Sequence, residues 1–194
     1  SVIAARNANG ETAVFPPVEC VFDPRYNLVD YLLSPSSASA AILQRAEAVA
    51  RQVVEAFGIV GLLAVEMFVT KQGEVLVNEV APRPHNSGHQ TICANHVSQF
   101  EQHLRAILNQ PLGDTRLKSP SAMVNLLGAD GHSGPVRYEG LAEVLAIAGT
   151  NVVLYGKKET RPHRKMGHVT ILDSDIPRLL EKVEQVKRIL KVVT

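Results

Sequence analysis

Cysteine is scarce in this sequence, and the two that occur, Cys20 and Cys93, are far apart and in no metal-ligand spacing. This usage indicates packing residues in a reducing, cytosolic compartment. No uninterrupted apolar run approaches about 18 residues, so we expect no membrane span. No signal-peptide pattern opens the chain either.

Net charge is also nearly absent, because 20 Lys and Arg residues stand against 19 Asp and Glu residues, for a formal charge of +1. No overall field therefore draws the chain to nucleic acid or to a membrane, and we expect neither partner. The 194 residues, 45% of them apolar, suffice for a sizeable core in one large domain or two small ones. The chain opens on Ser-Val-Ile-Ala-Ala-Arg, without Met and in strand-like sequence. We therefore expect a fragment or a processed product.

The common phosphate-binding loops are missing as well. Neither GxxxxGK[ST] nor GxGxxG after a strand occurs. Any nucleotide must therefore be bound by a different kind of site.

Periodicity and turn residues predict the elements of the first half of the chain. A β-hairpin is expected around the Asn- and Gly-rich turn at 7–10. Pro16 and Pro17 demote part of its second strand to an edge or a bulge. Gly58 suits the end of a helix, and Ser98 with Glu101 forms a capping-box signature. The expected segments are strands at 2–6 and 12–22, a loop at 23–36, a helix at 37–57, strands at 59–69 and 74–81, an irregular loop at 82–89, and a helix after Ser98 with Phe100, Leu104 and Leu108 as its buried stripe.

The Pro- and Gly-bearing segment 109–120 marks a boundary between two parts of the chain. After it the pattern predicts strands at 121–128, 151–155 and 167–172, a short helix at 138–145, and a last helix at 176–192. That last helix carries Leu179, Val183, Val186 and Leu190 on one face.

Two glutamates, Glu66 and Glu79, lie inside strands that are otherwise almost wholly apolar. A buried carboxylate is costly unless a cation or a set of donors matches it. A turn over 71–74 places Glu66 directly opposite Glu79, with Cβ atoms about 5 Å apart. Such a pair of oxygen ligands favours magnesium, usually shared with nucleotide phosphates.

The alternative for this pair is a solvated sheet face, which antiparallel sheets commonly have. A register slip of one residue would oppose Glu66 to Asn78 and weaken the magnesium interpretation. On the expected register, apolar residues share the face of the glutamates and argue against full solvation: Ala64, Phe68, Val75 and Val77.

The run from Arg83 to His89 follows the second glutamate strand directly. Arginine offers a rigid fork for carboxylate or phosphate, and histidine can move a proton near neutral pH. A polar loop with a chance pair of histidines is the plain alternative. Zinc held by His85 and His89 is another, although their spacing lacks the helix that would place them on one face.

A basic run lies near the end of the chain and comprises Lys157, Lys158, Arg161, Arg164 and Lys165. Such a run is commonly a solvated surface, but it can also grip a phosphate. Nucleic acid is disfavoured, because the run is short and has little aromatic interleaving beyond Tyr155.

These residues together resemble a known family. The segments Glu66-Met67-Phe68, 77–89 and Ser98-Gln99-Phe100-Glu101 are similar to 5-(carboxyamino)imidazole ribonucleotide synthase, an ATP-grasp enzyme, and 155–159 with 161–168 are similar to its C-terminal domain. The resemblance covers nearly the whole chain. It implies an α+β fold, in which residues 1–112 form the second ATP-grasp lobe, a mostly antiparallel sheet with flanking helices, and 113–194 form a small α/β C-terminal domain.

The same resemblance implies ATP and Mg²⁺ as cofactors, bicarbonate and aminoimidazole ribonucleotide as substrates, and a cytoplasmic homodimer. Glu66 and Glu79 would be the magnesium ligands, with Phe68 near the adenine and Asn78 near the nucleotide. Arg83, His85 and Asn86 would serve bicarbonate and the aminoimidazole. Lys157 and Arg164 would grip the ribonucleotide phosphate, with Lys158, Arg161 and Lys165 as neighbours able to substitute for them.

The family's N-terminal domain and first ATP-grasp lobe have no counterpart in this sequence, so we expect little or no ligase activity from the chain alone. Three alternatives remain open. They are another ATP-grasp ligase, such as a formate-dependent glycinamide ribonucleotide transformylase, a dimerisation or binding module, and a metal hydrolase using Glu66, Glu79, His85 and His89.

Overall fold

The computed structural model describes residues 1–23 and 28–194, and these form two compact units. Unit 1 comprises Ser1–Cys20 and Leu33–Ser119, and unit 2 comprises Val21–Leu32 and Pro120–Thr194. Both combine antiparallel strand pairs with helices, which confirms the α+β class. The predicted division after residue 112 stays a prediction. Among the described residues, no helix has both the length and the apolar character needed to cross a membrane.

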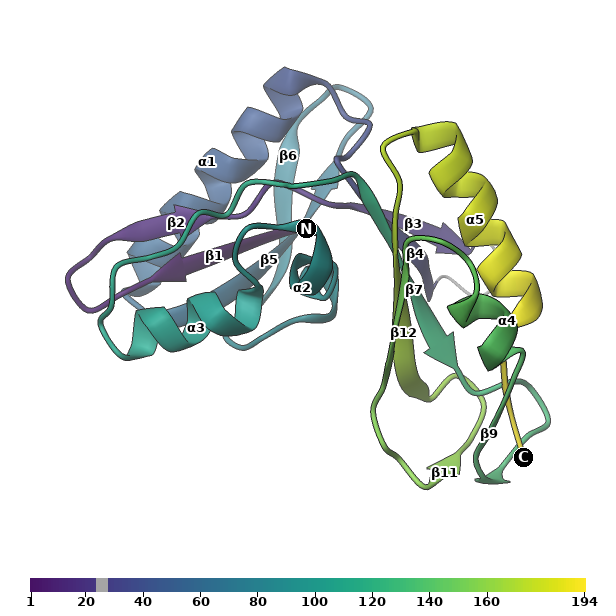
Figure 1. The fold of residues 1–194 in the computed structure, drawn as a ribbon. Coiled ribbons are helices and arrows are strands. Elements are labelled where there is room, and N and C mark those ends of the chain that lie inside the picture. Colours follow the sequence, from purple (N-terminus) through teal and green to yellow (C-terminus); the bar gives the residue numbers. More distant parts are fainter. Residues whose placement is uncertain (24–27) are drawn as a thin grey trace. The chain divides into compact units, whose positions relative to one another are not determined.

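Unit 1 is built on a four-stranded sheet in the order β2-β1-β5-β6 (Figure 1). Its strands are β1 (Val2–Arg6), β2 (Thr12–Val14), β5 (Gly61–Val69) and β6 (Val75–Ala81). Helix α1 (Ala40–Phe57) packs on one face, and α3 (Gln99–Ile107) contacts β1 and β5. Side chains from both faces of β1 and β5 are therefore buried, which accounts for the near-continuous apolar run in the sequence.

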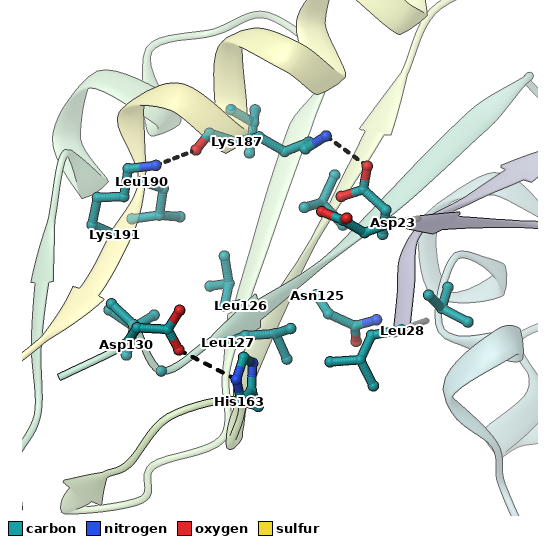
Figure 2. A pocket seen from close by; sticks show the side chains of 17 residues that line it. Asp23, Leu28, Asn125, Leu126, Leu127, Asp130, His163, Lys187, Leu190 and Lys191 are labelled. Atoms are coloured by element: carbon teal, nitrogen blue, oxygen red, sulfur yellow. Dashed lines mark hydrogen bonds and ion pairs between the residues drawn. The ribbon is translucent and has the colours of Figure 1, made fainter. Parts of the chain in front are cut away.

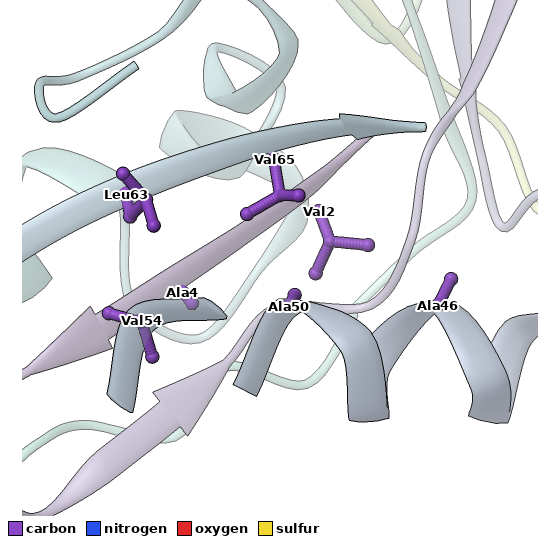
Figure 3. Close-up of a cluster of buried hydrophobic side chains, with 7 residues drawn as sticks. All are labelled: Val2, Ala4, Ala46, Ala50, Val54, Leu63 and Val65. Carbon is purple, nitrogen blue, oxygen red and sulfur yellow. The ribbon is translucent and has the colours of Figure 1, made fainter. Parts of the chain in front are cut away.

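The core between α1 and the sheet is made largely of small and β-branched side chains (Figure 3). Alanines on both partners let the helix approach the strands closely. The buried members are Val2, Ala4, Ala46, Ala50, Val54, Leu63 and Val65. The opposite face of the sheet contributes a second cluster of Ile3, Ala5, Phe15, Leu62, Ala64 and Val97.

Helix α1 ends at Gly58 as predicted but begins at Ala40, three residues later than expected. Ser39 is the N-cap, and its side chain accepts a hydrogen bond from the Ile42 N–H at 3.4 Å. Gly58 ends the helix with φ 60°, in the left-handed region, and its N–H donates to the Glu55 carbonyl at 3.0 Å.

Gly58→Ala should lower the free energy of unfolding by about 1 kcal/mol, because an L side chain is strained at this positive φ. The strain is conformational, since a Cβ at Gly58 would meet nothing within 4 Å. Urea denaturation measures the loss, and Gly58→Asn is the matched control because Asn tolerates the left-handed region better. Equal losses in the two variants would contradict this explanation.

Helix α3 starts as predicted but buries a different face. The Ser98 hydroxyl accepts from the Glu101 N–H at 3.1 Å, which confirms the cap. The predicted stripe is wrong, because Phe100, Leu104 and Leu108 are 40%, 55% and 65% exposed. The buried residues are instead Gln99, Gln102 and Ala106. Each glutamine amide bonds a nearby loop backbone, which offsets the cost of its burial.

Unit 2 holds a five-stranded sheet in the order β10-β12-β7-β4-β3, with two smaller strand pairs. Its elements are β3 (Glu19–Asp23), β4 (Leu28–Ser34), β7 (Ser121–Leu127), β8 (Gly134–Pro135), β9 (Arg137–Glu139), α4 (Leu141–Leu145), β10 (Thr150–Leu154), β11 (Glu159–Thr160), β12 (Lys165–Leu172), α5 (Ile176–Ile189) and β13 (Lys191–Val193). The apolar face predicted for the last helix is confirmed, since Leu179, Val183, Val186 and Leu190 are buried.

Several sequence-based boundaries are wrong, and the helix expected at 138–145 is only Leu141–Leu145, after β9. The segment 12–22 is not one strand, because β2 ends at Val14 before the two prolines and β3 belongs to the other sheet. The predicted loop at 23–36 contains β4, while its residues 24–27 lie outside the described residues. The last helix ends at Ile189, and Lys191–Val193 pairs with β9.

Candidate functional site

The β5–β6 hairpin places the two glutamates opposite each other. The register pairs Ala64 with Ala81, Val65 with Val80, and Glu66 with Glu79, which confirms the predicted pairing. Beyond this point the register shifts, so that Met67 faces Val77 and Asn78 becomes an extra residue on β6. Asn78 is thus part of a β-bulge that lies beside the carboxylate pair.

The bulge changes which residues share the glutamate face. Val75 packs with the cluster beneath α1, and Val77 is paired with Met67, which packs there too. Val75 and Val77 were therefore wrongly predicted on the glutamate face, because one extra residue inverts the alternation of side chains. Phe68, paired with Leu76, remains on the glutamate side with Ala64.

A histidine completes the carboxylate pair. Ligand atoms of Glu66, Glu79 and His85 all lie within 4.8 Å of one another. His85 Nε2 is 3.7 Å from Glu66 Oε1, and the side chains of His85 and Glu66 are 11% and 31% exposed. Glu79 is exposed. Two carboxylates and an imidazole from one hairpin and the loop after it can hold a divalent cation, so these residues fit the implied metal.

The loop after β6 orients His85 through its own hydrogen bonds. His85 Nδ1 is 2.9 Å from Ser87 Oγ and 3.3 Å from the Ser87 N–H that it accepts from. These contacts leave Nε2 directed toward Glu66. The loop is less irregular than predicted, because a 3₁₀ turn, η1 (Asn86–Gly88), and the short helix α2 (Thr91–Ala94) follow.

The other loop residues diverge from His85. Arg83 is exposed, and its guanidinium donates to the Pro84 carbonyl at 3.1 Å. Asn86 begins the 3₁₀ turn, and its carbonyl accepts from the His89 N–H at 3.2 Å. The His89 ring stacks on Phe100 with centroids 5.8 Å apart. The His85 ring thus lies near Glu66 and the His89 ring on Phe100, and the candidate metal group among the described residues includes His85 but not His89.

An exposed apolar surface lies at the tip of the same hairpin. Phe68 is 59% exposed, and its cross-strand partner Leu76 on the glutamate side is 50% exposed. Asn78 is exposed beside it. Exposed apolar side chains next to oxygen ligands suit a base joined to phosphates.

The basic run of unit 2 lies between the end of β10 and Lys165, the first residue of β12, with the short strand β11 inside it; we call 155–165 the basic loop. Lys157 Nζ donates to the Lys165 carbonyl at 2.5 Å and lies 5.6 Å from the Tyr155 ring centroid. Arg164 Nη1 donates to the Glu159 carbonyl at 2.8 Å, so the backbone of the loop holds both cations. Lys158, Arg161 and Lys165 are exposed. These five residues thus lie in the basic loop and at the start of β12.

Sequence reasoning missed Gly128, which fixes this loop to the end of β7. Its N–H donates to the Arg164 carbonyl, and its carbonyl accepts from the His163 N–H, both at 2.9 Å. A Cβ at Gly128 would overlap the Arg161 carbonyl and the Thr160 hydroxyl. The glycine therefore permits a close backbone approach that only the folded chain reveals.

Sequence reasoning also missed a buried histidine behind the basic loop. His168 on β12 is 1% exposed, and its Nδ1 lies 3.1 Å from the Tyr155 hydroxyl. Burial lowers the pKa of His168 from 6.5 to about 4, because desolvation disfavours the charged imidazolium. Burial likewise raises the pKa of the Tyr155 hydroxyl.

A pocket of about 300 Å³ lies within unit 2, between β4, β7 and α5 (Figure 2). Lys187 pairs there with Asp30 at 2.6 Å, and His163 pairs with Asp130 at 3.2 Å. None of the site residues predicted from the sequence lines it.

Comparison with known proteins connects this geometry to a family. Residues 1–100, more than half of the chain, match the family described as ATP-grasp domain. The chain belongs to the ATP-grasp family. Residues 121–182 of this ATP-grasp chain match the Phosphoribosylaminoimidazole carboxylase C-terminal domain. The resemblance inferred from the motifs is thus confirmed.

Several relatives of this ATP-grasp chain are named as synthases or synthetases of N5-carboxyaminoimidazole ribonucleotide. The N5-carboxyaminoimidazole ribonucleotide synthase of Bacillus subtilis is 44% identical over 172 residues, which are 89% of this chain and 43% of the relative. The crystal structure of the synthetase from Thermotoga maritima is 52% identical with a TM-score of 0.92, over 100% of this chain and 51% of that one. The Aspergillus clavatus synthase, solved with ADP and 5-aminoimidazole ribonucleotide, is 31% identical with a TM-score of 0.85, over 96% and 50%. The chain therefore spans about half the length of these relatives.

Proposed function

We propose that this chain supplies half of an N5-carboxyaminoimidazole ribonucleotide synthase, a ligase of purine biosynthesis that uses ATP and bicarbonate. The observation that carries the proposal is the convergence of Glu66, Glu79 and His85 within 4.8 Å on the ATP-grasp hairpin. Relatives that share the fold carry this activity in their names, and one was solved with ADP and the aminoimidazole ribonucleotide.

In the proposed reaction, a bicarbonate oxygen attacks the γ-phosphorus of ATP, ADP leaves, and carboxyphosphate forms. The exocyclic amine of the ribonucleotide then forms a bond to the carboxyl carbon, and phosphate leaves as the amine loses a proton. Glu66 and Glu79 would hold Mg²⁺, which neutralises charge on the phosphates when bound. Phe68 and Asn78 would contact the nucleotide at the hairpin tip.

The loop after the hairpin would serve the carboxylating half of the reaction. Arg83 is exposed and can turn its guanidinium to the charge that develops on carboxyphosphate. His85 is held with one nitrogen toward Glu66, a placement that suits proton transfer beside the carboxylate pair. Asn86 would assist with its amide.

For the basic loop of unit 2, we propose a grip on the ribonucleotide phosphate, with Lys157 and Arg164 as the main donors. The loop backbone already holds both side chains, so little conformational entropy is lost on binding. Lys158, Arg161 and Lys165 would raise the local positive charge.

Arg164→Gln should raise the KM for the ribonucleotide at least tenfold and leave the KM for ATP unchanged. One charge-assisted hydrogen bond is worth roughly 1.5–3 kcal/mol, and about 1.4 kcal/mol corresponds to a factor of ten. Steady-state kinetics measure both constants. Arg137→Gln, which removes an arginine that is 65% exposed in the same unit, is the control. A uniform rise in both KM values would contradict the assignment.

The proposed function is tested by joining this chain to the part of a relative that it does not cover. A chimera would join this chain to the remaining half of the Thermotoga maritima enzyme, to which it is 52% identical. We expect ATP turnover that requires both bicarbonate and the aminoimidazole ribonucleotide in the chimera, and little or none in the chain alone. If the isolated chain turned over ATP in a ribonucleotide-dependent way, the proposal that it supplies only half of the enzyme would be refuted.

The same assay separates the alternatives. Turnover with formate and glycinamide ribonucleotide in place of bicarbonate and the aminoimidazole would point to another ATP-grasp ligase. Tightly bound zinc in metal analysis would favour a hydrolase. The homodimer and the cytoplasmic location stay predictions, and light scattering of the chimera tests the first.

A further inference from the structure

Gln99 is a buried polar residue whose side-chain amide forms hydrogen bonds with the loop that carries His85. Its side chain is fully buried on α3. Oε1 accepts from the His85 N–H at 2.9 Å, and Nε2 donates to the His85 carbonyl at 2.8 Å. The amide of Gln99 thus holds both backbone polar groups of one site residue.

The remaining hydrogen of the Gln99 amide reaches the second histidine of the loop. Nε2 lies 3.2 Å from His89 Nδ1. Because Nε2 is a donor, Nδ1 of His89 must accept, which places the ring proton of neutral His89 on Nε2. One amide thereby specifies the backbone of His85 and the tautomer of His89.

The loop is packed tightly against this amide. A Cβ built at Gly88 would lie 2.5 Å from Gln99 Oε1 and 2.7 Å from its Cδ, so only glycine leaves room for the side chain. Thr91 fastens the same region, since its hydroxyl donates to the Gly88 carbonyl at 2.5 Å and accepts from the Gln99 N–H at 2.8 Å. The amide cannot shift without moving the loop.

We propose that Gln99 is a positioning residue, which sets His85 beside Glu66 and Glu79 before any ligand binds. The catalytic consequence rests on the proposed function, whereas the structural one does not. An imidazole whose backbone is held on both sides needs no ordering at the moment of reaction. Gln99 itself need not touch a substrate for this effect.

The chain contains a matched control on the same helix. Gln102 is also fully buried, and its amide makes the same pair of bonds to the backbone of Gly113, from Nε2 to the carbonyl at 3.0 Å and from the N–H to Oε1 at 2.8 Å. Gly113 is not among the proposed site residues. Gln99→Met and Gln102→Met each remove a buried amide that is hydrogen-bonded to the N–H and the carbonyl of a single residue. That residue is His85 for Gln99 and Gly113 for Gln102.

Hydrogen exchange on the 194-residue chain tests the structural part without any ligase assay. We expect Gln99→Met to raise the amide exchange rate at His85 and through 85–89 at least tenfold. Gln102→Met should raise the exchange rate only around Gly113. Both variants should lower the melting temperature, so a general loss of stability cannot explain a difference between the two loops. Equal exchange at 85–89 in both variants would overturn the proposal.

Kinetics in the chimera test the catalytic part. Gln99→Met should lower kcat at least tenfold while changing the KM for ATP less than threefold, and Gln102→Met should leave kcat within twofold. An inactive unmutated chimera would count against the proposed function alone. An active chimera with unchanged kcat in Gln99→Met would count against the positioning role alone.

A second variant keeps the test decisive if Gln99→Met does not fold. Gly88→Ala retains Gln99 but forces a methyl group against its amide. We expect the same local rise in exchange at 85–89, and unchanged exchange there would overturn the proposal.

Discussion

Replacing Glu79 with glutamine is expected to lower ATP turnover in the chimera by a factor of about 100 to 1,000. The change is nearly isosteric and removes one of the two charged oxygen ligands on the hairpin. Metal-ion charge stabilisation of a phosphoryl transition state is worth several kcal/mol, and each 1.4 kcal/mol is a factor of ten in rate. The affinity of the isolated chain for Mn²⁺, used as a probe for Mg²⁺, should fall with the turnover.

The same variant should be slightly more stable than the parent chain. Glu66 and Glu79 are directly opposed on neighbouring strands, and like charges in that position destabilise a sheet. Glu79→Gln should therefore raise the free energy of unfolding by about 0.2–1 kcal/mol. A variant that is more stable but less active would indicate that the Glu66–Glu79 pair serves function rather than folding.

Glu74→Gln supplies the control for this prediction. Glu74 is an exposed carboxylate in the turn of the same hairpin, where its carbonyl accepts from the Thr70 N–H at 2.9 Å. Turnover and Mn²⁺ affinity should remain within twofold in this variant. The magnesium assignment fails if Glu79→Gln and Glu74→Gln have equal turnover and equal Mn²⁺ affinity.

Lowering the pH should lower the free energy of unfolding of the chain, because His168 is buried. Burial holds the pKa of His168 at about 4 in the folded chain, against 6.5 as the ordinary value. Between these two values the unfolded chain binds a proton that the folded chain excludes, so the free energy of unfolding falls as the pH falls. The loss begins near pH 6.5, is complete near pH 4, and amounts to about 3 kcal/mol.

His168→Gln removes the titrating group and leaves a side chain that can still bond the Tyr155 hydroxyl. Its free energy of unfolding should vary less between pH 7 and pH 4.5 than that of the parent, by about 2 kcal/mol. Urea denaturation at several pH values measures this, with His96→Gln as the control because His96 is exposed. A pH dependence in His168→Gln as steep as that of the parent would contradict the prediction.

Much of the candidate site follows from local sequence. The turn residues at 71–73 predict the hairpin, and the pairing of Glu66 with Glu79 is confirmed. The register beside the turn is one residue off the predicted one, however, and the bulge at Asn78 restores the pairing. Pro82 and Pro84 end the strand, so His85 must lie close beyond it. The hairpin and the loop after it are predictable because turn chemistry depends on residues only a few positions apart.

The bulge at Asn78 and the buried face of α3 were not predictable in the same way. A bulge leaves the composition of a strand unchanged, so nothing in the sequence places Val75 and Val77 away from the glutamates. Hydrophobic periodicity selects Phe100, Leu104 and Leu108 for burial, yet α3 buries Gln99 and Gln102 instead. Their partners, the backbones of His85 and Gly113, lie 14 and 11 residues away in sequence.

The sequence by itself determined the helix that ends at Gly58, the Ser98 cap of α3, the hairpin that carries the two glutamates, and the motif run that marks the ATP-grasp family. Only the tertiary structure decided that β3 and β4 join the sheet of unit 2, that Gly128 anchors the basic loop, and that Gln99 holds His85. The physical reason is the range of the interactions. Propensities, caps and turns act between near neighbours, whereas buried hydrogen bonds and close backbone approaches arise only where distant segments meet.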